Sequence, residues 1–191
     1  MSIPVSVVML AQNSAETLDR ALASVRAFDE VVVVDGGSVD ATASIAAAYP
    51  NVVWRVHPFR GFAEQRNFAL RQASHPWCLV LDSDETATPE LVEGIASRRW
   101  EDVPTSLYYV MRTDWFMGRE LDSGYARSTS HARFFRKARV DYRGHVHESP
   151  FVDGRKPHRD AEWVGTLPAD WRILHRPDND PGAGHRGERR R

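Results

Sequence analysis

The chain lacks several features that would assign it to a special class of protein. Cys78 is the only cysteine among 191 residues, so no internal disulfide can form and we expect a reducing compartment. No stretch approaches the roughly 18 to 20 consecutive apolar residues that span a bilayer. The formal net charge is only -1, which argues against nucleic acid as a partner. The apolar start MSIPVSVVML has no positively charged region before it, so we interpret it as a strand and not as a signal peptide.

The first half shows a regular alternation of two hydrophobic patterns. Short apolar runs rich in valine predict strands that are covered on both faces. The segments between them have helical spacing; Asn13 or Ser14 is expected to cap the first helix and Thr88, followed by Pro89, the last. This order predicts an α/β fold with a Rossmann-type, mainly parallel sheet and helices on both faces. The expected strands cover 5–10, 30–35, 51–56 and 77–82, and the expected helices lie within 13–25, 39–49 and 61–73 and after 88.

The second half has a different character. From Leu107 onward the chain is aromatic, rich in arginine and short in period, which predicts short strands and loops in a mainly antiparallel arrangement. We expect one domain over residues 1–175, divided into halves 1–99 and 100–175. Residues 176–191 have no apolar periodicity and are predicted to form a disordered tail.

Two of the predicted strands end in an aspartate, Asp35 and Asp82. Parallel strands bring their carboxyl ends to one edge of the sheet, which is where such sheets bind ligands. Asp35 precedes Gly-Gly-Ser, a turn that lets the backbone approach a ligand closely, although its spacing is not that of a dinucleotide-binding loop. The alternative is that Asp35 is a solvated residue of a tight turn.

Asp82 and Asp84 are separated by a single serine at the end of an apolar strand. In an extended segment both carboxylates leave the chain on the same side. Two negative charges this close repel each other unless a cation compensates them, and Mg²⁺ or Mn²⁺ prefers such oxygen ligands together with substrate phosphates. The alternative, that one aspartate caps the next helix, is weakened because Thr88 already fills that position.

In this order the motifs resemble those of glycosyltransferase family 2, which has the GT-A fold. The resemblance rests on VSVVMLAQNSAETLDRALASV, DEVVVVDGGSVDAT, GFAEQRNFAL and WCLVLDSDE, and extends over about residues 5–175. The later pieces MRTDWFMGREL, ARFFRKARVDYRGHVHE and ILH are similar to a bacterial subgroup that builds lipopolysaccharide core, the β-1,4-glucosyltransferase type. The resemblance implies a metal-dependent, inverting transferase. Its donor would be a nucleotide-diphospho sugar, a UDP-sugar, bound by the first half, and its acceptor a glycan or lipid-linked molecule bound by the second.

The resemblance also implies roles for particular residues of the first half. Asp35 would bind the nucleotide base. Asp82 would contact the ribose or a metal-bound water, and Asp84 would ligate the Mg²⁺ or Mn²⁺ that bridges the diphosphate. A polar set would lie beside the nucleotide, unless it is an exposed helix face; it comprises Gln65, Arg66 and Asn67.

The second half would supply the base that deprotonates the acceptor hydroxyl. Glu148 in GHVHES is the preferred candidate and Asp114 in RTDWF is the alternative. His147 and His175 would each be a further metal ligand or a diphosphate donor, unless they are hydrogen-bonded structural residues. Arg133 and Arg136 in RFFRK would hold phosphates, unless they form the polar side of a half-buried strand.

Two other functions stay open at this point. A nucleotidyltransferase also uses strand-end carboxylates with Mg²⁺, but this chain has no glycine-rich loop with a lysine after its first strand. A protein that binds nucleotide sugars without turnover is the second alternative. Because the resembled family acts on lipid-linked acceptors, a cytoplasmic protein with peripheral contact to the inner membrane is implied. The basic residues available for this contact in the tail are Arg186, Arg189, Arg190 and Arg191.

Overall fold

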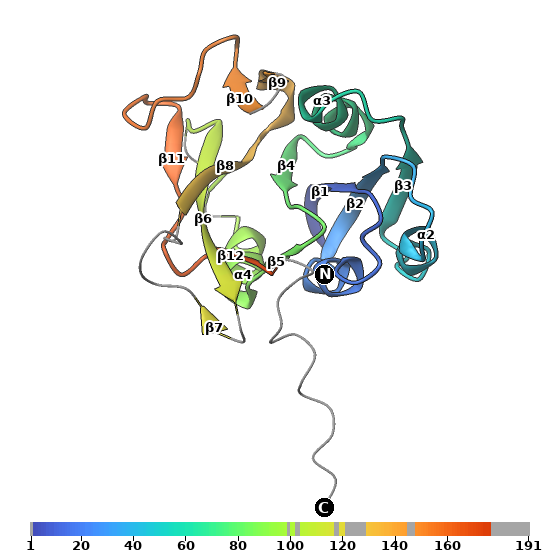
Figure 1. The fold of residues 1–191 in the computed structure, drawn as a ribbon. Coiled ribbons are helices and arrows are strands. Elements are labelled where there is room, and N and C mark those ends of the chain that lie inside the picture. Colours follow the sequence, from blue (N-terminus) through green and yellow to red (C-terminus); the bar gives the residue numbers. More distant parts are fainter. Residues whose placement is uncertain are drawn as a thin grey trace, which may run out of the picture.

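A computed structural model of the chain describes residues 2–98, 100–101, 104–116, 119–120, 129–144 and 148–176. Within these residues a ten-stranded sheet runs through the molecule in the order β3-β2-β1-β4-β8-β6-β12-β5, with β7 and β11 paired to β6, and a separate two-stranded sheet joins β9 and β10 (Figure 1). The strands are β1 Ile3–Ala11, β2 Phe28–Asp35, β3 Val52–Val56, β4 Trp77–Val80, β5 Glu85–Ala87, β6 Leu107–Phe116, β7 Arg119–Glu120, β8 Thr129–Arg136, β9 Val140–Arg143, β10 Ser149–Val152, β11 Val164–Thr166 and β12 Arg172–His175. The helices are α1 Leu18–Ser24, α2 Thr42–Ala46, α3 Phe62–Gln72 and α4 Pro89–Ala96, with a short 3₁₀ turn at Lys137–Arg139.

The first four strands pair in parallel, as their valine-rich runs predict. Strand β1 lies between β2 and β4, and its last residue, Ala11, is the register partner of Asp35 at the end of β2. Strand β3 pairs with the outer side of β2, also in parallel. The carboxyl ends of β1 and β2 therefore lie at one edge of the sheet, and β4 ends on the same side.

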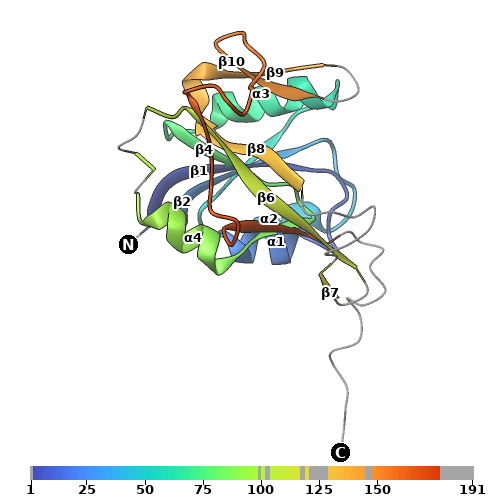
Figure 2. The ribbon, with the colours of Figure 1, turned by 90° about the vertical axis from the view of Figure 1, so that its left-hand side faces the viewer.

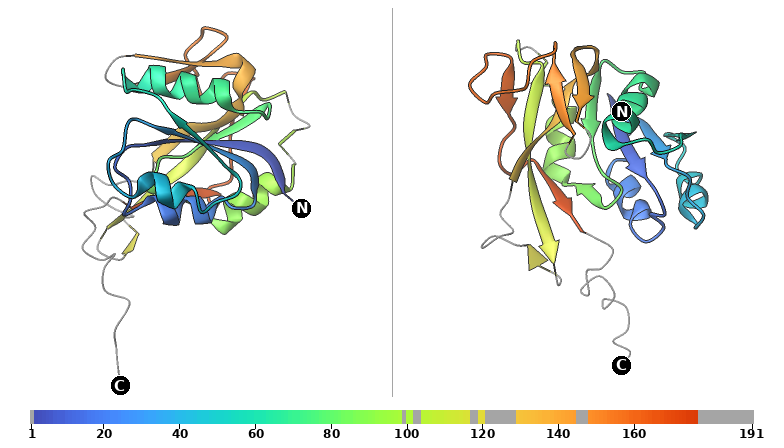
Figure 3. Two further views of the ribbon diagram at one scale, coloured as in Figure 1. Left: turned by 90° about the vertical axis from the view of Figure 1, so that its right-hand side faces the viewer. Right: turned by 45° about the horizontal axis from the view of Figure 1, so that its top comes forward.

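Helices cover both faces of this sheet, which confirms the prediction. Figures 2 and 3 show α1, α2 and α4 on one face and α3 on the other, with β9 and β10 beside α3. The side chains agree: Leu22 of α1 and Leu91 of α4 belong to one buried cluster, while Leu70 of α3 belongs to another.

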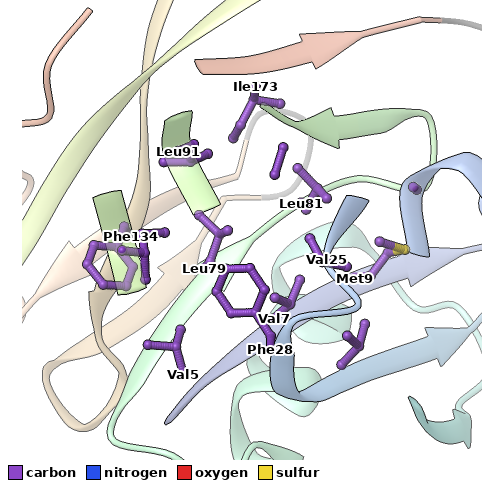
Figure 4. Packing of buried hydrophobic residues seen from close by; sticks show 14 of the residues in the cluster. Val5, Val7, Met9, Val25, Phe28, Leu79, Leu81, Leu91, Phe134 and Ile173 are labelled. Carbon is purple, nitrogen blue, oxygen red and sulfur yellow. The ribbon is translucent and has the colours of Figure 1, made fainter. Parts of the chain in front are cut away.

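Alternation along β1 produces these two clusters. Val5, Val7 and Met9 point into the larger cluster, whereas Val8 belongs to the cluster beneath α3. Figure 4 shows the larger cluster, in which residues from β1 pack against Phe28 and against residues from β4, α4 and β12. Burying one side chain of this size stabilises the fold by about 1.5–3 kcal/mol, so the strand that carries the site is firmly held.

The second half departs from its prediction. Its strands are not all short, since β6 has 10 residues and β8 has 8, and they extend the same sheet. Strands β4, β8 and β6 are antiparallel neighbours as expected, but β11 and β12 both pair with β6 in parallel. Most strand pairs of the second half are therefore antiparallel as expected, and the pairs of β11 and β12 with β6 are the exceptions. Strand β12 lies between β6 and β5. It is antiparallel to β5 and joins that strand to the sheet.

One of the two predicted helix caps is confirmed. The Thr88 side chain accepts a hydrogen bond from the Leu91 amide, and Pro89 follows it. The cap predicted for the first helix is wrong, because α1 begins only after Thr17 and no side chain caps it. Asn13 and Ser14 are instead engaged with the loop after β2, where the Asn13 side chain accepts a hydrogen bond from the Val39 amide.

Arg176 is the last described residue. The sequence predicts it as the first residue of a disordered tail, but in the structure it is held by contacts with the domain. Its backbone amide donates to the carbonyl of Asp84 at 2.9 Å, and its guanidinium lies 4.2 Å from the ring centre of Trp115. Residues 177–191, with the four tail arginines, lie outside the described residues, as does His147. None of the helices in the described ranges has both the length and the hydropathy needed to cross a bilayer.

Candidate active site

A cleft of about 480 Å³ opens at the carboxyl ends of β1, β2 and β4. This is the position at which ligands bind to parallel α/β sheets. Segments far apart in the chain contribute to its walls. Those from the first half are Leu10, Ala11, Gln12, Ser14, Thr17, Val34, Gly36, Phe59, Phe62, Gln65, Arg66 and 82–85, and those from the second half are Arg112, Glu148 and His175.

Three residues that line the cleft, Arg66, Asp82 and Glu85, form an arginine network with Arg133, which lies behind them. Arg66 Nη2 donates to Asp82 Oδ1 at 2.8 Å, and Arg133 Nη2 donates to Asp82 Oδ2 at 3.0 Å. Arg133 also donates to Glu85 Oε1 at 2.9 Å, and Glu85 Oε2 accepts from the Asp82 amide at 3.0 Å. Both carboxylate oxygens of Asp82 therefore face an arginine.

Charge pairing controls the pKa values in the arginine network. Burial acts to raise the pKa of Asp82, but Arg133 and Arg66 outweigh it and hold this pKa well below its usual range. Burial acts to lower the pKa of each arginine, yet the neighbouring carboxylates, Asp82 above all, keep both above the ordinary value. Burial raises the pKa of Glu85, an effect that Arg133 partly offsets. Asp82 is thus a permanent anion held between two permanent cations.

Glu148 extends this network across the cleft. Arg66 Nε donates to Glu148 Oε1 at 2.9 Å, so a single guanidinium joins Glu148 to Asp82. The Glu148 side chain is 18% exposed and lines the cleft. Glu148, the preferred candidate for the base, therefore lies in the same cleft as Asp82 and Asp84, the residues predicted to bind the nucleotide sugar and its metal.

A second group, the histidine cluster, lies at the rim and consists of Asp84, His175 and Asp114. His175 Nε2 lies 3.1 Å from Asp84 Oδ2, and His175 Nδ1 lies 2.9 Å from Asp114 Oδ1. Strand pairing produces this arrangement, because His175 on β12 is the register partner of Asp114 on β6. The hydrogen bond to Asp84 raises the pKa of His175 against the effect of burial, and the hydrogen bond to Asp114 acts in the same direction.

The histidine cluster offers two metal donors that the arginine network does not occupy. The Asp84 side chain is 34% exposed, and its carboxylate and the His175 imidazole converge on one another. Oxygen and imidazole nitrogen suit a divalent cation that completes its shell with phosphate and water oxygens. Across the described residues, no group of three or more His, Cys, Asp and Glu side chains could hold a metal ion. Asp84 and His175 therefore fit such a cation only as part of a site that a ligand completes.

The structure places the other predicted residues as follows. The Asp35 carboxylate is buried and accepts hydrogen bonds from the Gly37 and Ser38 amides, so it is not the solvated turn residue of the alternative. Gln65 lines the cleft, and its side chain is bonded to His57. Asn67 lies away from the cleft and joins α3 to β9 by two hydrogen bonds with the Tyr142 backbone. Nucleotide contacts of Asp35 and Asn67 stay predictions.

The cleft thus brings together six predicted residues, namely Gln65, Arg66, Asp82, Asp84, Glu148 and His175. Sequence reasoning missed the roles of Glu85 and Arg112. Glu85 is fully buried and paired with Arg133, and Arg112 Nη2 lies 3.2 Å from Asp114 Oδ1. Glu85 directly follows Asp84 in the sequence, so the acidic run from 82 to 85 could have marked it as a residue of the site. No local signal marks Arg112.

Sequence comparisons match the chain to known glycosyltransferases. The family model described as Glycosyl transferase family 2 matches residues 6–156. Lipopolysaccharide core biosynthesis glycosyltransferase LpsC from Rhizobium meliloti (strain 1021) is 31% identical over 161 residues, which are 80% of this chain and 58% of that protein. Succinoglycan biosynthesis protein ExoO from the same organism is 39% identical over 101 residues, 49% of this chain and 29% of that protein. The chain spans less than two thirds of the length of either relative.

Structural comparison shows the same fold. S. aureus TarS 1-349, solved with UDP-GlcNAc, superposes with a TM-score of 0.63 at 20% identity, over 93% of this chain and 59% of that chain. This likeness confirms the predicted GT-A-like α/β fold. Glucosyl-3-phosphoglycerate synthase from Mycobacterium tuberculosis, solved with Mn²⁺ and UDP-glucose, aligns over 56% of this chain and 43% of that chain at 25% identity. Its TM-score is only 0.47, so its ligands carry no argument for this chain.

Proposed function

The chain belongs to glycosyl transferase family 2, and on that premise we propose that it moves a sugar from a UDP-sugar to a hydroxyl of a glycan or lipid-linked acceptor, with inversion at the anomeric carbon. One observation carries the proposal. Asp84 and His175 converge at the rim of a cleft that also contains Glu148, so a cation-binding pair and a candidate base share one cavity. The similarity to LpsC supports an acceptor of the lipopolysaccharide-core type.

The donor diphosphate would lie near the histidine cluster. Asp84 and His175 would hold Mg²⁺ or Mn²⁺, which, when bound, offsets the negative charge that develops on the leaving diphosphate. Asp114 accepts from His175 Nδ1, which orients the imidazole so that Nε2 faces Asp84. Arg112 lines the cleft beside this cluster and adds a fixed positive charge next to the proposed position of the diphosphate.

The nucleotide base would occupy the other end of the cleft. Phe59 and Phe62 are about half exposed, contact one another edge to face at 5.0 Å between ring centres, and line the cleft. Val34 and Gly36 flank Asp35 in the same wall. A carboxylate oxygen can accept more than one hydrogen bond, so Asp35 can hold its own turn and still accept N3–H of uracil. Calorimetric titration should therefore show tighter binding of UDP than of CDP, and Asp35→Ala should remove the difference; equal affinities would contradict this role.

Glu148 is the base in this proposal. The acceptor oxygen bonds to the anomeric carbon as the bond from that carbon to the diphosphate oxygen breaks, and the hydroxyl proton passes to Glu148. Arg66 occupies Glu148 Oε1, while Oε2 has no hydrogen bond within the described ranges. Asp114 is the weaker candidate, because it is bonded to His175 and Arg112 and does not line the cleft.

The test separates binding from chemistry. The chain is incubated with UDP-glucose and Mn²⁺, with and without EDTA, and UDP release is measured. Glu148→Gln should bind UDP like the wild type and release it about 10²–10⁴-fold more slowly, because an amide cannot take the proton. Glu162→Gln, an exposed matched change, should have no effect. When pyrophosphate is added, formation of UTP and glucose 1-phosphate from UDP-glucose would indicate a nucleotidyltransferase. Binding without release of UDP would indicate a binding protein. Either result contradicts the proposal.

We also propose that a lipid-linked acceptor is met at the cytoplasmic face of the membrane by peripheral contact. The name of LpsC, a lipopolysaccharide core biosynthesis glycosyltransferase, supports a lipid-linked acceptor. Co-sedimentation with liposomes that contain anionic lipid, compared with neutral liposomes, would test it. Equal binding to both would contradict an electrostatic contact.

A further inference from the structure

A second cavity, of about 260 Å³, adjoins the cleft. Strands β8, β9 and β10 and the segment after β10 form most of its walls. Arg66 and Glu148 line both cavities, so their ion pair is the partition between them. Nothing in the donor chemistry above uses this space.

The partition places the candidate base where two substrates would meet. A sugar ring in the second cavity would present a hydroxyl to Glu148 from one side, while the donor would approach from the cleft on the other side. The cavity is slightly smaller than the roughly 300–1,000 Å³ typical of pockets for drug-sized ligands, which suits one sugar unit. Tyr109 and Tyr142 in its walls provide aromatic surface.

The charges of the second cavity differ from those of the cleft. Its walls contain three cations, Arg66, Arg133 and Lys156, but Glu148 is their only acid. Asp82 pairs with both arginines from the cleft side. Lys156 is exposed and makes no ion pair with any described residue. It is therefore the cation that an incoming anion can reach directly.

Two polar atoms in the same walls lack partners. Arg66 Nη1 and Ser130 Oγ are buried and make no hydrogen bond within the described ranges. Their residues both line the second cavity, and the Arg66 side chain is only 9% exposed. Buried donors without partners are rare, and a polar ligand or ordered water usually satisfies them. His131, also in the wall, has its pKa lowered to about 4 by burial and by Arg133 and Arg112, so it is a neutral hydrogen-bonding group.

The segment that covers the cavity adds to the positive charge. It reads Arg-Lys-Pro-His-Arg from 155 to 159. Arg159 is exposed, and its guanidinium lies 4.6 Å from the ring centre of Tyr109, at the cavity wall. An anion approaching the second cavity therefore meets Lys156 and Arg159 before it meets any acid of the site.

We propose that the second cavity is the acceptor subsite and that it takes a sugar carrying a phosphate or carboxylate group. The ring lies against Tyr109 and Tyr142, the anionic group contacts Lys156, and one hydroxyl reaches Glu148. This inference rests on the proposed function, because it assigns the acceptor of that reaction.

The experiment titrates sugars into the full chain saturated with UDP and Mg²⁺, using calorimetry. The probes are D-mannose 6-phosphate, D-glucuronate and neutral D-mannose. The two charged sugars should bind more tightly than mannose. Lys156→Gln should weaken them by about fivefold, the upper end of what an exposed ion pair contributes, and Lys156→Arg should restore binding. Arg26→Gln, an exposed change of the same charge remote from the cavity, should have no effect.

Each contrary result has a defined meaning. Equal affinity for mannose and mannose 6-phosphate, or no response to Lys156→Gln, would overturn the anionic class. Binding of a charged sugar to the chain without UDP but not to the UDP-saturated chain would place the sugar in the donor cleft and overturn the subsite. Titration of UDP alone tests the proposed function separately: a chain that binds UDP but no charged sugar overturns only this inference, whereas a chain that does not bind UDP overturns the proposed function.

Discussion

The arginine network and the histidine cluster use the same kind of residue for opposite purposes. Asp82 and Asp84 are two positions apart and similarly exposed, with side chains that are 30% and 34% accessible. Asp82 is held by two arginines that are always charged, whereas the side chain of Asp84 is bonded to a histidine that can lose its proton. The first carboxylate is therefore fixed in place, and the second can exchange its partner for a cation.

The largest expected effect comes from breaking the arginine network. Arg133→Met removes a buried cation and leaves Glu85 and Asp82 facing an apolar side chain. Loss of one partner from a buried ion pair should lower the free energy of unfolding by about 3–5 kcal/mol. Urea denaturation measures it, with the exposed Arg155→Met as the control. A loss below about 1 kcal/mol would mean that the network does not stabilise the fold.

The matching change in the histidine cluster should act on activity far more than on stability. Asp84→Asn keeps the shape of the side chain but removes a charged donor. We expect turnover of UDP-glucose with Mn²⁺ to fall about 100-fold, or about 2.7 kcal/mol in activation free energy. The exposed Asp170→Asn is the control and should keep wild-type stability in urea, whereas Asp84→Asn should lose no more than about 1 kcal/mol, the contribution of its ion pair with His175. Unchanged turnover would remove Asp84 from the proposed metal site.

A smaller effect is expected from the orienting residue of the same cluster. Asp114→Asn keeps the side chain beside His175 Nδ1 but weakens the hydrogen bond that orients the ring. Changes of this kind lower metal affinity by about 10–100-fold, and we expect the lower end. Mn²⁺ binding in the presence of UDP, measured by electron paramagnetic resonance, gives the affinity without turnover. A fall in turnover with unchanged Mn²⁺ affinity would favour the alternative, that Asp114 is the base.

The smallest effect is a pH dependence of the chain without metal. His175 has a raised pKa in the folded protein, so its contribution to stability is fully present below its unfolded value of about 6.5 and is lost as pH rises through the folded pKa. The free energy of unfolding of the wild type should therefore exceed that of His175→Gln by more at pH 6 than at pH 8. Denaturation of both proteins at the two pH values measures this gap. A gap that widens with pH would contradict the ion pair with Asp84.

The sheet of the first half could be predicted because its signals are local. Continuous valine-rich runs are typical of strands that are covered on both faces. All four expected strands are present, each within a few residues of its predicted bounds. The helix cap at Thr88 was predictable for the same reason. The cap at Asn13 or Ser14 was not, because contacts with the loop after β2, distant in the sequence, engage both residues and delay the helix to Leu18.

The site was predictable only where its residues share a local segment. Asp82 and Asp84 stand out because they follow a strand directly. The partners of these residues depend on strand pairing: Asp114 meets His175 because β6 and β12 pair in parallel register, a pairing that no periodicity reveals. The side of the sheet on which Arg133 lies can be assigned only when β8 is known to pair with β4.

The position of β12 has a consequence for synthesis of the protein on the ribosome. His175 follows Asp84 by 91 positions, so it emerges roughly 5–20 seconds later at usual rates of translation. Until then, the edge of β6 that receives β12 is unpaired, and Asp84 lacks its histidine. A nascent chain can therefore fold its first strands but cannot assemble the proposed cation pair. Strand β12 therefore completes the proposed cation pair only after the 91 residues that follow Asp84 have been synthesised.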